Sequence, residues 1–177
     1  MNLERITRTD KLGTPFEIRI SCAEDFPPLL RMYDTFSPKP ASQGLPPEDP
    51  EICQNWVKTL FKTGVNSLAW RDNGVIGHVA LIPSVHWKWG ELVVFVDQNH
   101  RNRGVGTELM RFSLGEFEQL GFELVWLTVR VLNFIAIKLY RKLGFEFCDM
   151  DSYERVMAVK LGSTASLTLS DRRALEE

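Results

Sequence analysis

The chain has 177 residues, enough for one domain and short for two, and 44% of them are hydrophobic, which is ordinary for a globular protein with a full core. Its formal net charge of −2 gives no overall basic field, so we expect no nucleic-acid partner, and any anion site must be local. No apolar run approaches the roughly 18 residues that a membrane span needs, and the N-terminus lacks the apolar core of a signal peptide, so we expect no membrane partner.

The cysteines point to the reducing interior of a cell. Cys22, Cys53 and Cys148 are scattered along the chain, and their spacing is not that of metal ligands. A small, odd number of cysteines favours free thiols over a disulfide framework. We therefore expect a cytoplasmic protein that binds no metal.

Composition divides the chain into three segments. Residues 1–15 are polar, and we expect them to be irregular. Residues 16–161 carry the periodic apolar patterns of a folded domain. The tail at 162–177 is polar, and its sequence shows no core partner.

The domain begins with a strand and a helix. Residues 16–20 alternate apolar and polar side chains, which predicts a half-buried strand. A helix is expected to follow up to Phe36, because Pro27 and Pro28 are tolerated in a first turn. Five prolines then exclude a helix or central strand over 37–50, so this segment is either a surface excursion or one wall of a substrate site.

A helix and an antiparallel meander are expected next. Residues 51–62 have the apolar spacing of one helix face, and residues 65–70 form a short strand. The turn at 72–74, Asp-Asn-Gly, favours a hairpin whose returning strand covers 75–82. The Val- and Phe-rich run at 91–97 is a further strand.

A basic, glycine-containing loop links that strand to a helix over 104–120. The first N–H groups of a helix have no partner within it, and the helix dipole adds partial positive charge there. Gly104 and Gly106 have no side chains that would block those groups, and Arg101 and Arg103 add formal charge. This arrangement predicts a phosphate or other anion site. The pattern is not a lysine-bearing P-loop, because no Gly-Lys-Ser/Thr occurs in the chain.

The last part of the domain continues the sheet. Residues 122–131 are almost continuously apolar, as in a strand buried on both faces, and we expect a parallel pair with 91–97. Asn133 is positioned to cap a helix that ends at Gly144. Strands at 145–148 and 153–161 complete an α/β fold with a mixed, mostly antiparallel sheet flanked by helices.

Two motifs resemble those of the GNAT superfamily of N-acetyltransferases, which use acyl-CoA. The run Arg101-Asn-Arg-Gly104-Val-Gly106 matches the motif Arg/Gln-x-x-Gly-x-Gly. The run from Asn133 to Phe145 resembles the motif Asn-x-x-Ala-x-x-Leu-Tyr-x-x-x-Gly-Phe. The resemblance implies a sheet that splays open between the strands at 91–97 and 122–130, with the pantetheine arm of acetyl-CoA in the opening.

The resemblance also implies cofactor-binding residues. The pyrophosphate of acetyl-CoA would meet backbone N–H groups of Arg103 to Thr107, and the backbone around Val94 and Val96 would pair with the pantetheine amides. Asn133 could bond the pantetheine arm as well as cap its helix. The full implied set is Val94, Phe95, Val96, Arg101, Arg103, Gly104, Val105, Gly106, Thr107, Asn133 and Ala136.

For the chemistry, the resemblance implies that Tyr140 donates a proton to the departing sulfur. The general base is open. Family members that use a glutamate carry it at the position of Gly90, one residue before Glu91, and a shift of one residue sends a strand side chain to the opposite face. His86 and His78 are alternatives because histidine titrates near physiological pH, and a chain of water molecules is a further possibility.

Together these features predict an N-acetyltransferase that moves an acetyl group from acetyl-CoA to a primary amine by direct attack in a ternary complex. The motifs contain no cysteine, which disfavours an acyl-enzyme. The acceptor could be a small molecule, a peptide N-terminus or a lysine, and Trp87, Trp89 and Phe95 could form an aromatic wall for it. The alternative is a non-catalytic module that binds or senses acyl-CoA, or a regulatory interaction domain. The resemblance also leaves a homodimer open.

Overall fold

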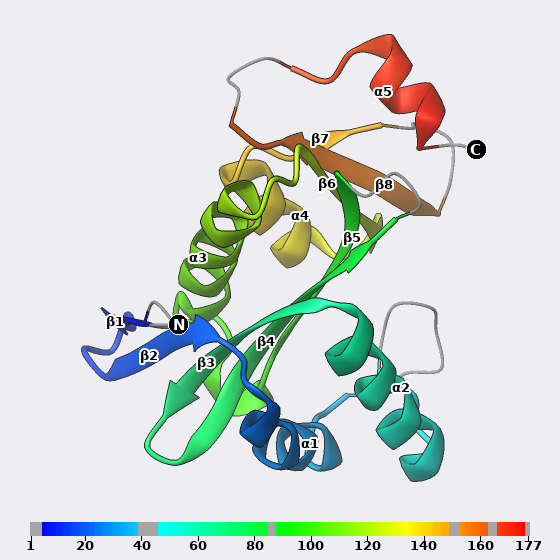
Figure 1. The fold of residues 1–177 in the computed structure, drawn as a ribbon. Helices are drawn as coiled ribbons and strands as arrows, with labels where there is room; N and C mark the ends of the chain where they lie inside the picture. The colour runs from blue at the N-terminus through cyan, green and yellow to red at the C-terminus, as the bar shows by residue number, and fades with distance from the viewer. Residues whose placement is uncertain (1–4, 39–45, 85–87, 149–152, 163–165, 176–177) are drawn as a thin grey trace. The chain divides into compact units, whose positions relative to one another are not determined.

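A computed structural model describes residues 5–38, 46–84, 88–148, 153–162 and 166–175. Among these residues, eight strands form a sheet in the order β1-β2-β3-β4-β5-β6-β8-β7. The strands β5 and β6 pair in parallel, and the pairs β1–β2, β2–β3, β3–β4, β6–β8 and β7–β8 are antiparallel. The expected mixed sheet is therefore confirmed. The strands are β1 (Arg5–Thr9), β2 (Pro15–Ile20), β3 (Val65–Arg71), β4 (Gly74–Pro83), β5 (Trp89–Val96), β6 (Leu124–Arg130), β7 (Glu146–Phe147) and β8 (Glu154–Lys160) (Figure 1).

The helices α1 to α4 lie close to where the sequence predicts them, whereas α5 in the tail was not predicted. Pro27 and Pro28 occupy the first turn of α1, and Pro50 begins α2 behind the N-cap Asp49. The helices are α1 (Phe26–Asp34), α2 (Pro50–Thr63), α3 (Val105–Gln119), α4 (Phe134–Lys142) and α5 (Leu169–Ala174), with short 3₁₀ helices η1 (Ala23–Asp25) and η2 (Gln98–His100). No helix in the described ranges is long and apolar enough to cross a bilayer.

Contacts divide the chain into two compact units. Unit 1 comprises Met1–Ile82 and Val93–Ser113, and unit 2 comprises Pro83–Leu92 and Leu114–Glu177. The first half of β5 belongs to unit 2 and its second half to unit 1. The helix α3 begins in unit 1 and ends in unit 2.

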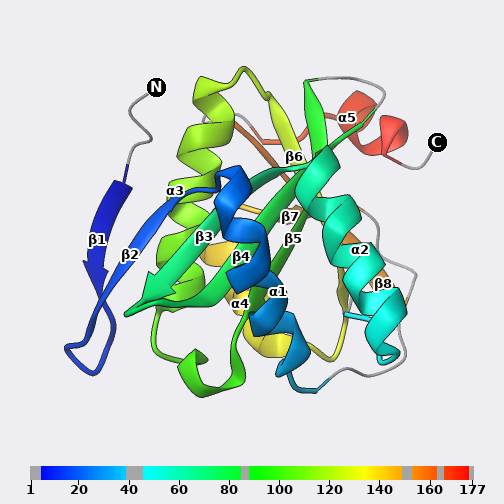
Figure 2. The same cartoon turned by 60° about the horizontal axis from the view of Figure 1, so that its bottom comes forward.

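In unit 1, α1 and α2 cover one face of β3 and β4 (Figure 2). Their core cluster includes Tyr33 of α1, Val57 of α2 and Phe95 of β5, each less than a tenth exposed. On β4, a Cβ atom added to Gly77 would come within 3.0 Å of Leu109 Cδ2 from α3. Glycine at this position therefore lets the start of α3 pack closely on the sheet.

In unit 2, α4 and α5 lie on opposite sides of β8 (Figure 1). Strand alternation explains the two sides, because Ala158 of β8 packs with Leu167 before α5, while the adjacent Val159 approaches Gly144 at the end of α4. The parallel pairing of β5 with β6 runs from Trp89↔Leu124 to Glu91↔Trp126. The predicted parallel pair is therefore confirmed over these residues.

The prediction that the N-terminal segment is irregular was wrong for its described part. Arg5–Thr9 forms β1 and pairs with β2 from Arg5↔Arg19 to Thr9↔Pro15. Almost every residue of β1 is exposed, so the segment has no apolar face whose alternation could reveal a strand.

The prediction that the tail has no core partner was also wrong. Leu167 is only 9% exposed and packs with Leu124 and Ala158. The ammonium of Lys160 on β8 lies 2.7 Å from Oδ2 of Asp171 on α5, and this ion pair links α5 to the sheet. A single buried leucine in a polar stretch gives no periodic apolar pattern, so the packing of the tail could not be predicted from the sequence.

Candidate functional site

The loop before α3 presents backbone N–H groups as the sequence predicts. The amide of Glu108 donates to the Gly104 carbonyl at 3.1 Å, so the amides of Val105, Gly106 and Thr107 precede the first intrahelical donor. Asn102 and Gly104 take the left-handed conformation, with φ values of 61° and 91°. The chain thereby turns sharply into the helix and leaves amides available for an anion.

Asp97 holds the start of this loop. Its Oδ1 accepts a hydrogen bond from the amide of Asn99 at 3.0 Å and lies 2.8 Å from Nδ1 of His100. Its own amide donates to the carbonyl of Ile76 on β4 at 3.0 Å. Asp97 therefore fixes backbone and side-chain groups at the start of the loop.

The side chain of Arg101 links the loop to the end of β5. Its Nε donates to the carbonyl of Val96 at 2.9 Å, and its guanidinium carbon lies 4.9 Å from the centre of the Phe36 ring. Burial lowers the pKa of Arg101 and the nearby charge of Asp97 opposes that effect, so the side chain stays cationic. Part of its hydrogen-bonding capacity is thus committed to the protein.

The predicted residues on β5 have different environments. Val94 and Val96 are half-buried, whereas Phe95 is 5% exposed. The Phe95 ring packs edge-on against Tyr33, Phe36 and Trp56, at centroid distances of 5.6 to 5.7 Å. Its side chain is therefore committed to the core of unit 1.

The two residues of the predicted aromatic wall that the structure describes belong to different clusters. Phe95 lies in the unit 1 cluster, and Trp89 packs with the cluster of Leu124 and Ala158 in unit 2. Trp87 and His86 lie outside the described residues.

In unit 2, the second motif forms α4. Oδ1 of Asn133 accepts the amide of Ala136 at 3.2 Å, which confirms the predicted cap. Tyr140 is 8% exposed, and its ring centre lies 5.8 Å from that of Phe145. Burial raises the pKa of Tyr140 to about 12, so its phenol stays protonated at neutral pH.

Glu91 also lies in unit 2. It pairs in register with Trp126 on the parallel strand β6, and its side chain is half-buried. Burial raises its pKa, because the charged carboxylate loses hydration there. A carboxylate with a raised pKa is a stronger proton acceptor than an exposed glutamate.

The sequence did not reveal a buried network around His78. The hydroxyl of Tyr33 lies 2.8 Å from its Nδ1, and Oδ1 of Asn66 lies 2.8 Å from its Nε2. Burial lowers the pKa of His78 to about 3, so the ring is neutral. With both nitrogens bonded and the side chain fully buried, His78 cannot serve as a solvent-facing general base.

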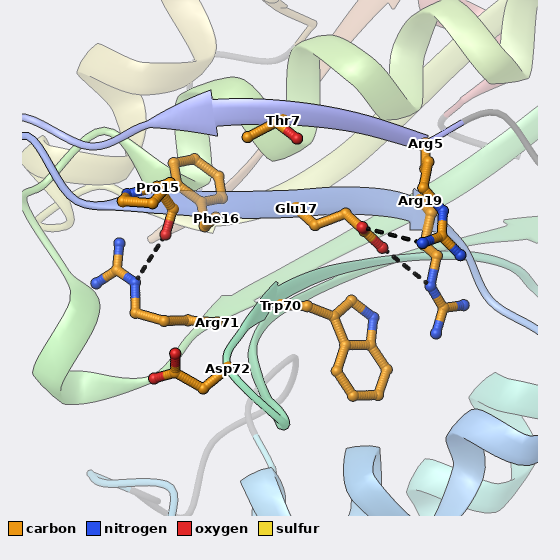
Figure 3. A pocket seen from close by; sticks show the side chains of 9 residues that line it. All are labelled: Arg5, Thr7, Pro15, Phe16, Glu17, Arg19, Trp70, Arg71 and Asp72. Atoms are coloured by element: carbon orange, nitrogen blue, oxygen red, sulfur yellow. Dashed lines mark hydrogen bonds and ion pairs between the residues drawn. The ribbon is translucent and has the colours of Figure 1, made fainter.

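The face formed by β1, β2 and β3 carries a shallow hollow lined by arginines (Figure 3). Glu17 lies between Arg5 and Arg19, at 3.3 and 3.5 Å. Arg71 pairs with Asp10 at 2.8 Å, and its Nε donates to the carbonyl of Pro15. Each of the three arginines that line the hollow as described, Arg5, Arg19 and Arg71, therefore already has a partner in the protein. We do not assign a ligand to this hollow.

The sequence profile of the Acetyltransferase (GNAT) family matches residues 29–145. The chain belongs to this family. The GNAT domain of S. lividans PAT has the same fold, with a TM-score of 0.76 at 16% identity over 89% of this chain and 97% of that chain. So does yncA, a putative acetyltransferase from Salmonella typhimurium with its cofactor acetyl-CoA, at a TM-score of 0.66 and 15% identity over 85% of this chain and 96% of that one.

Curated relatives match over very different lengths. A streptothricin acetyltransferase of Streptomyces lavendulae is 27% identical over 83% of this chain and 71% of its own length. The ribosomal protein bS18-alanine N-acetyltransferase of Escherichia coli K12 is 38% identical, over 29% of this chain and 35% of its own length.

The donors at the start of α3 suit the cofactor that this family uses. A diphosphate requires several convergent hydrogen-bond donors and positive charge. The backbone amides of the first turn of α3 supply the hydrogen-bond donors. Arg103 follows Asn102 in the same loop. Among the described residues, no three metal-ligating side chains gather where they could hold an ion.

Proposed function

We propose that the protein is an N-acetyltransferase that moves an acetyl group from acetyl-CoA to a primary amine by direct attack in a ternary complex. The observation that carries the proposal is the start of α3, where left-handed Gly104 leads into a turn of free backbone amides in a chain of the GNAT family. Acetyl-CoA supplies the acetyl group in activated form, as a thioester.

The cofactor residues of the proposal come from the two motifs and from β5. Backbone amides from Arg103 to Thr107 would bind the pyrophosphate, and Arg101 would contribute charge while holding the loop. The backbone of β5 from Val94 to Val96 would bond the amides of the pantetheine arm. Asn133 and Ala136 at the start of α4 complete the set.

The acid of the proposal is Tyr140. As the C–S bond of the thioester breaks, the sulfur takes up a proton, and a phenol with a pKa of about 12 is still protonated at neutral pH. Such a group is held in the donor form needed for general acid catalysis.

The base of the proposal is Glu91, with His86 as the alternative. As the new C–N bond forms, the amine nitrogen must lose a proton, and a half-buried carboxylate with a raised pKa is suited to accept it. A free lysine-type amine has a pKa of about 10.4, so the acceptor must also be deprotonated before it attacks.

The acceptor is proposed to be a small-molecule amine, with a peptide N-terminus or a lysine as alternatives. The match to the streptothricin acetyltransferase extends along 83% of the chain, whereas the match to the bS18-alanine enzyme covers 29%. Similarity that extends along most of the chain supports a small-molecule amine as the acceptor.

The proposal is tested by incubating the protein with acetyl-CoA and a panel of amines. The panel contains streptothricin, other small polyamines, a peptide with an N-terminal alanine and a lysine peptide. Release of CoA thiol and a product ~42 Da heavier than the amine, because an acetyl group replaces one hydrogen, are expected for at least one amine. Saturable acetyl-CoA binding without transfer to any amine would favour the non-catalytic module instead.

A further inference from the structure

The hairpin of β1 and β2 precedes the segment matched by the family profile, which begins at residue 29. Its tip is a tightly bonded turn. Oδ1 of Asp10 accepts the amides of Leu12 and Thr14 at 2.9 and 3.0 Å, and Oδ2 lies 2.8 Å from Arg71. The Thr14 amide is the main cause that lowers the pKa of Asp10 to about 2, so the turn is held by a carboxylate at all ordinary pH values.

The tip docks on the glycine loop. The amide of Lys11 donates to the carbonyl of Arg103 at 2.9 Å. Three residues before Lys11, on β1, Nε of Arg8 lies 3.3 Å from Oε2 of Glu108 in the first turn of α3. The hairpin is thus attached on both sides of Gly104, all within unit 1.

The side chain of Lys11 lies along Gly104. A Cβ atom added to Gly104 would meet Lys11 Cγ at 3.8 Å and Lys11 Cε at 4.0 Å. The aliphatic stem therefore passes over the glycine, and the ammonium group is one bond beyond Cε. Among the described residues, no carboxylate forms an ion pair with it, and residue 11 is exposed.

We propose that Lys11 is a further cofactor-binding residue, which the N-terminal hairpin adds to the glycine loop to contact a phosphate of acetyl-CoA. This inference rests on the proposed function. An unpaired ammonium beside the free amides of α3 supplements them with a full positive charge. The shared chemistry is an anionic phosphate group, and its source is either the pyrophosphate or the phosphate on the ribose.

Calorimetric titration of acetyl-CoA into the full chain and its Lys11→Met variant tests the proposal. Methionine keeps an unbranched stem over Gly104 and removes the charge, while the backbone bond to Arg103 remains. The variant is expected to bind about 3–10-fold more weakly at low salt, with a smaller difference at high salt because ions screen the contact. Lys11→Arg should restore most of the affinity. Lys62→Met, on the exposed side of α2, should bind like the wild type.

Repeating the titrations with dephospho-CoA separates the two phosphate sources. If the loss caused by Lys11→Met persists, Lys11 contacts the pyrophosphate, and if the loss disappears, it contacts the ribose phosphate. Either result supports the proposal. Unchanged affinity of Lys11→Met, or an equal loss in Lys62→Met, would overturn it while the proposed function stands. A folded wild type that binds no acetyl-CoA would overturn both.

Discussion

The hydroxyl of Tyr33 on α1 lies 2.8 Å from Nδ1 of His78 on β4, and both side chains are fully buried in unit 1. The other ring nitrogen faces Oδ1 of Asn66, whose amide nitrogen donates to carbonyls at the end of α2. Since Oδ1 can only accept, Nε2 carries the proton and Nδ1 accepts the Tyr33 hydroxyl hydrogen. The network therefore links α1, α2, β3 and β4 through one neutral tautomer.

Tyr33→Phe should destabilise the protein. The substitution removes the hydroxyl and leaves Nδ1 of His78 buried without a donor, which costs about 1–3 kcal/mol of unfolding free energy. Urea denaturation measures the change, with Tyr153→Phe as the matched control because Tyr153 is 60% exposed. Equal midpoints for Tyr33→Phe and the wild type would show that the bond contributes nothing.

The stability of the protein should fall as the pH falls below about 6.5. Burial lowers the folded-state pKa of His78 to about 3, from an ordinary value of 6.5. Between these values the unfolded chain binds a proton at His78 and the folded chain does not. The unfolding free energy should therefore decrease by up to about 1.4 kcal/mol per pH unit. Urea denaturation at pH 7.5, 6 and 5 measures the slope, and it should flatten in His78→Asn.

Tyr140→Phe should strongly reduce kcat while leaving acetyl-CoA bound. Loss of a general acid reduces kcat by about 10²–10⁴-fold, whereas phenylalanine preserves the packing of the ring on Phe145. Steady-state kinetics and calorimetry measure the two effects, again with Tyr153→Phe as control. Because the pKa of Tyr140 is about 12, its titration should not limit the rate below about pH 11. A full wild-type kcat in Tyr140→Phe would remove Tyr140 from the mechanism.

Glu91→Gln should lower kcat/KM and change its pH profile. If Glu91 is the base, activity falls as the pH drops through its pKa, which burial raises above the ordinary value of 4.5. That acidic limb should disappear in Glu91→Gln, with a loss of about 10²-fold or more. A limb near pH 6.5 that persists in the variant would point to His86.

The sequence predicts the local parts of the site well. A left-handed turn before a helix favours glycine, and an N-cap position favours asparagine. The roles of Gly104 and Asn133 could therefore be predicted from the sequence alone. The element order follows from apolar periodicity, and the turn at 72–74 joins β3 to β4 as expected.

Contacts between distant residues could not be predicted in the same way. Tyr33 and His78 are 45 positions apart, and the sequence around neither residue indicates that the other is its partner. Lys11 and Arg103 meet through backbone groups, which every residue possesses, so the sequence holds no trace of their bond. The strand β1 and the docked tail were missed for a related reason, because β1 is exposed and has no apolar face, and the tail packs through a single buried leucine.

The most direct test of the central claim is calorimetric binding of acetyl-CoA to the wild type and to Gly106→Trp. A tryptophan in the first turn of α3 would cover the amides proposed to hold the pyrophosphate. Gly115→Trp is the matched control, because a Cβ at Gly115 of the same helix meets no atom within 4 Å. We predict saturable binding by the wild type and Gly115→Trp, and at least roughly 100-fold weaker binding by a folded Gly106→Trp. A folded wild type that does not bind acetyl-CoA, or equal binding by Gly106→Trp, would contradict the account.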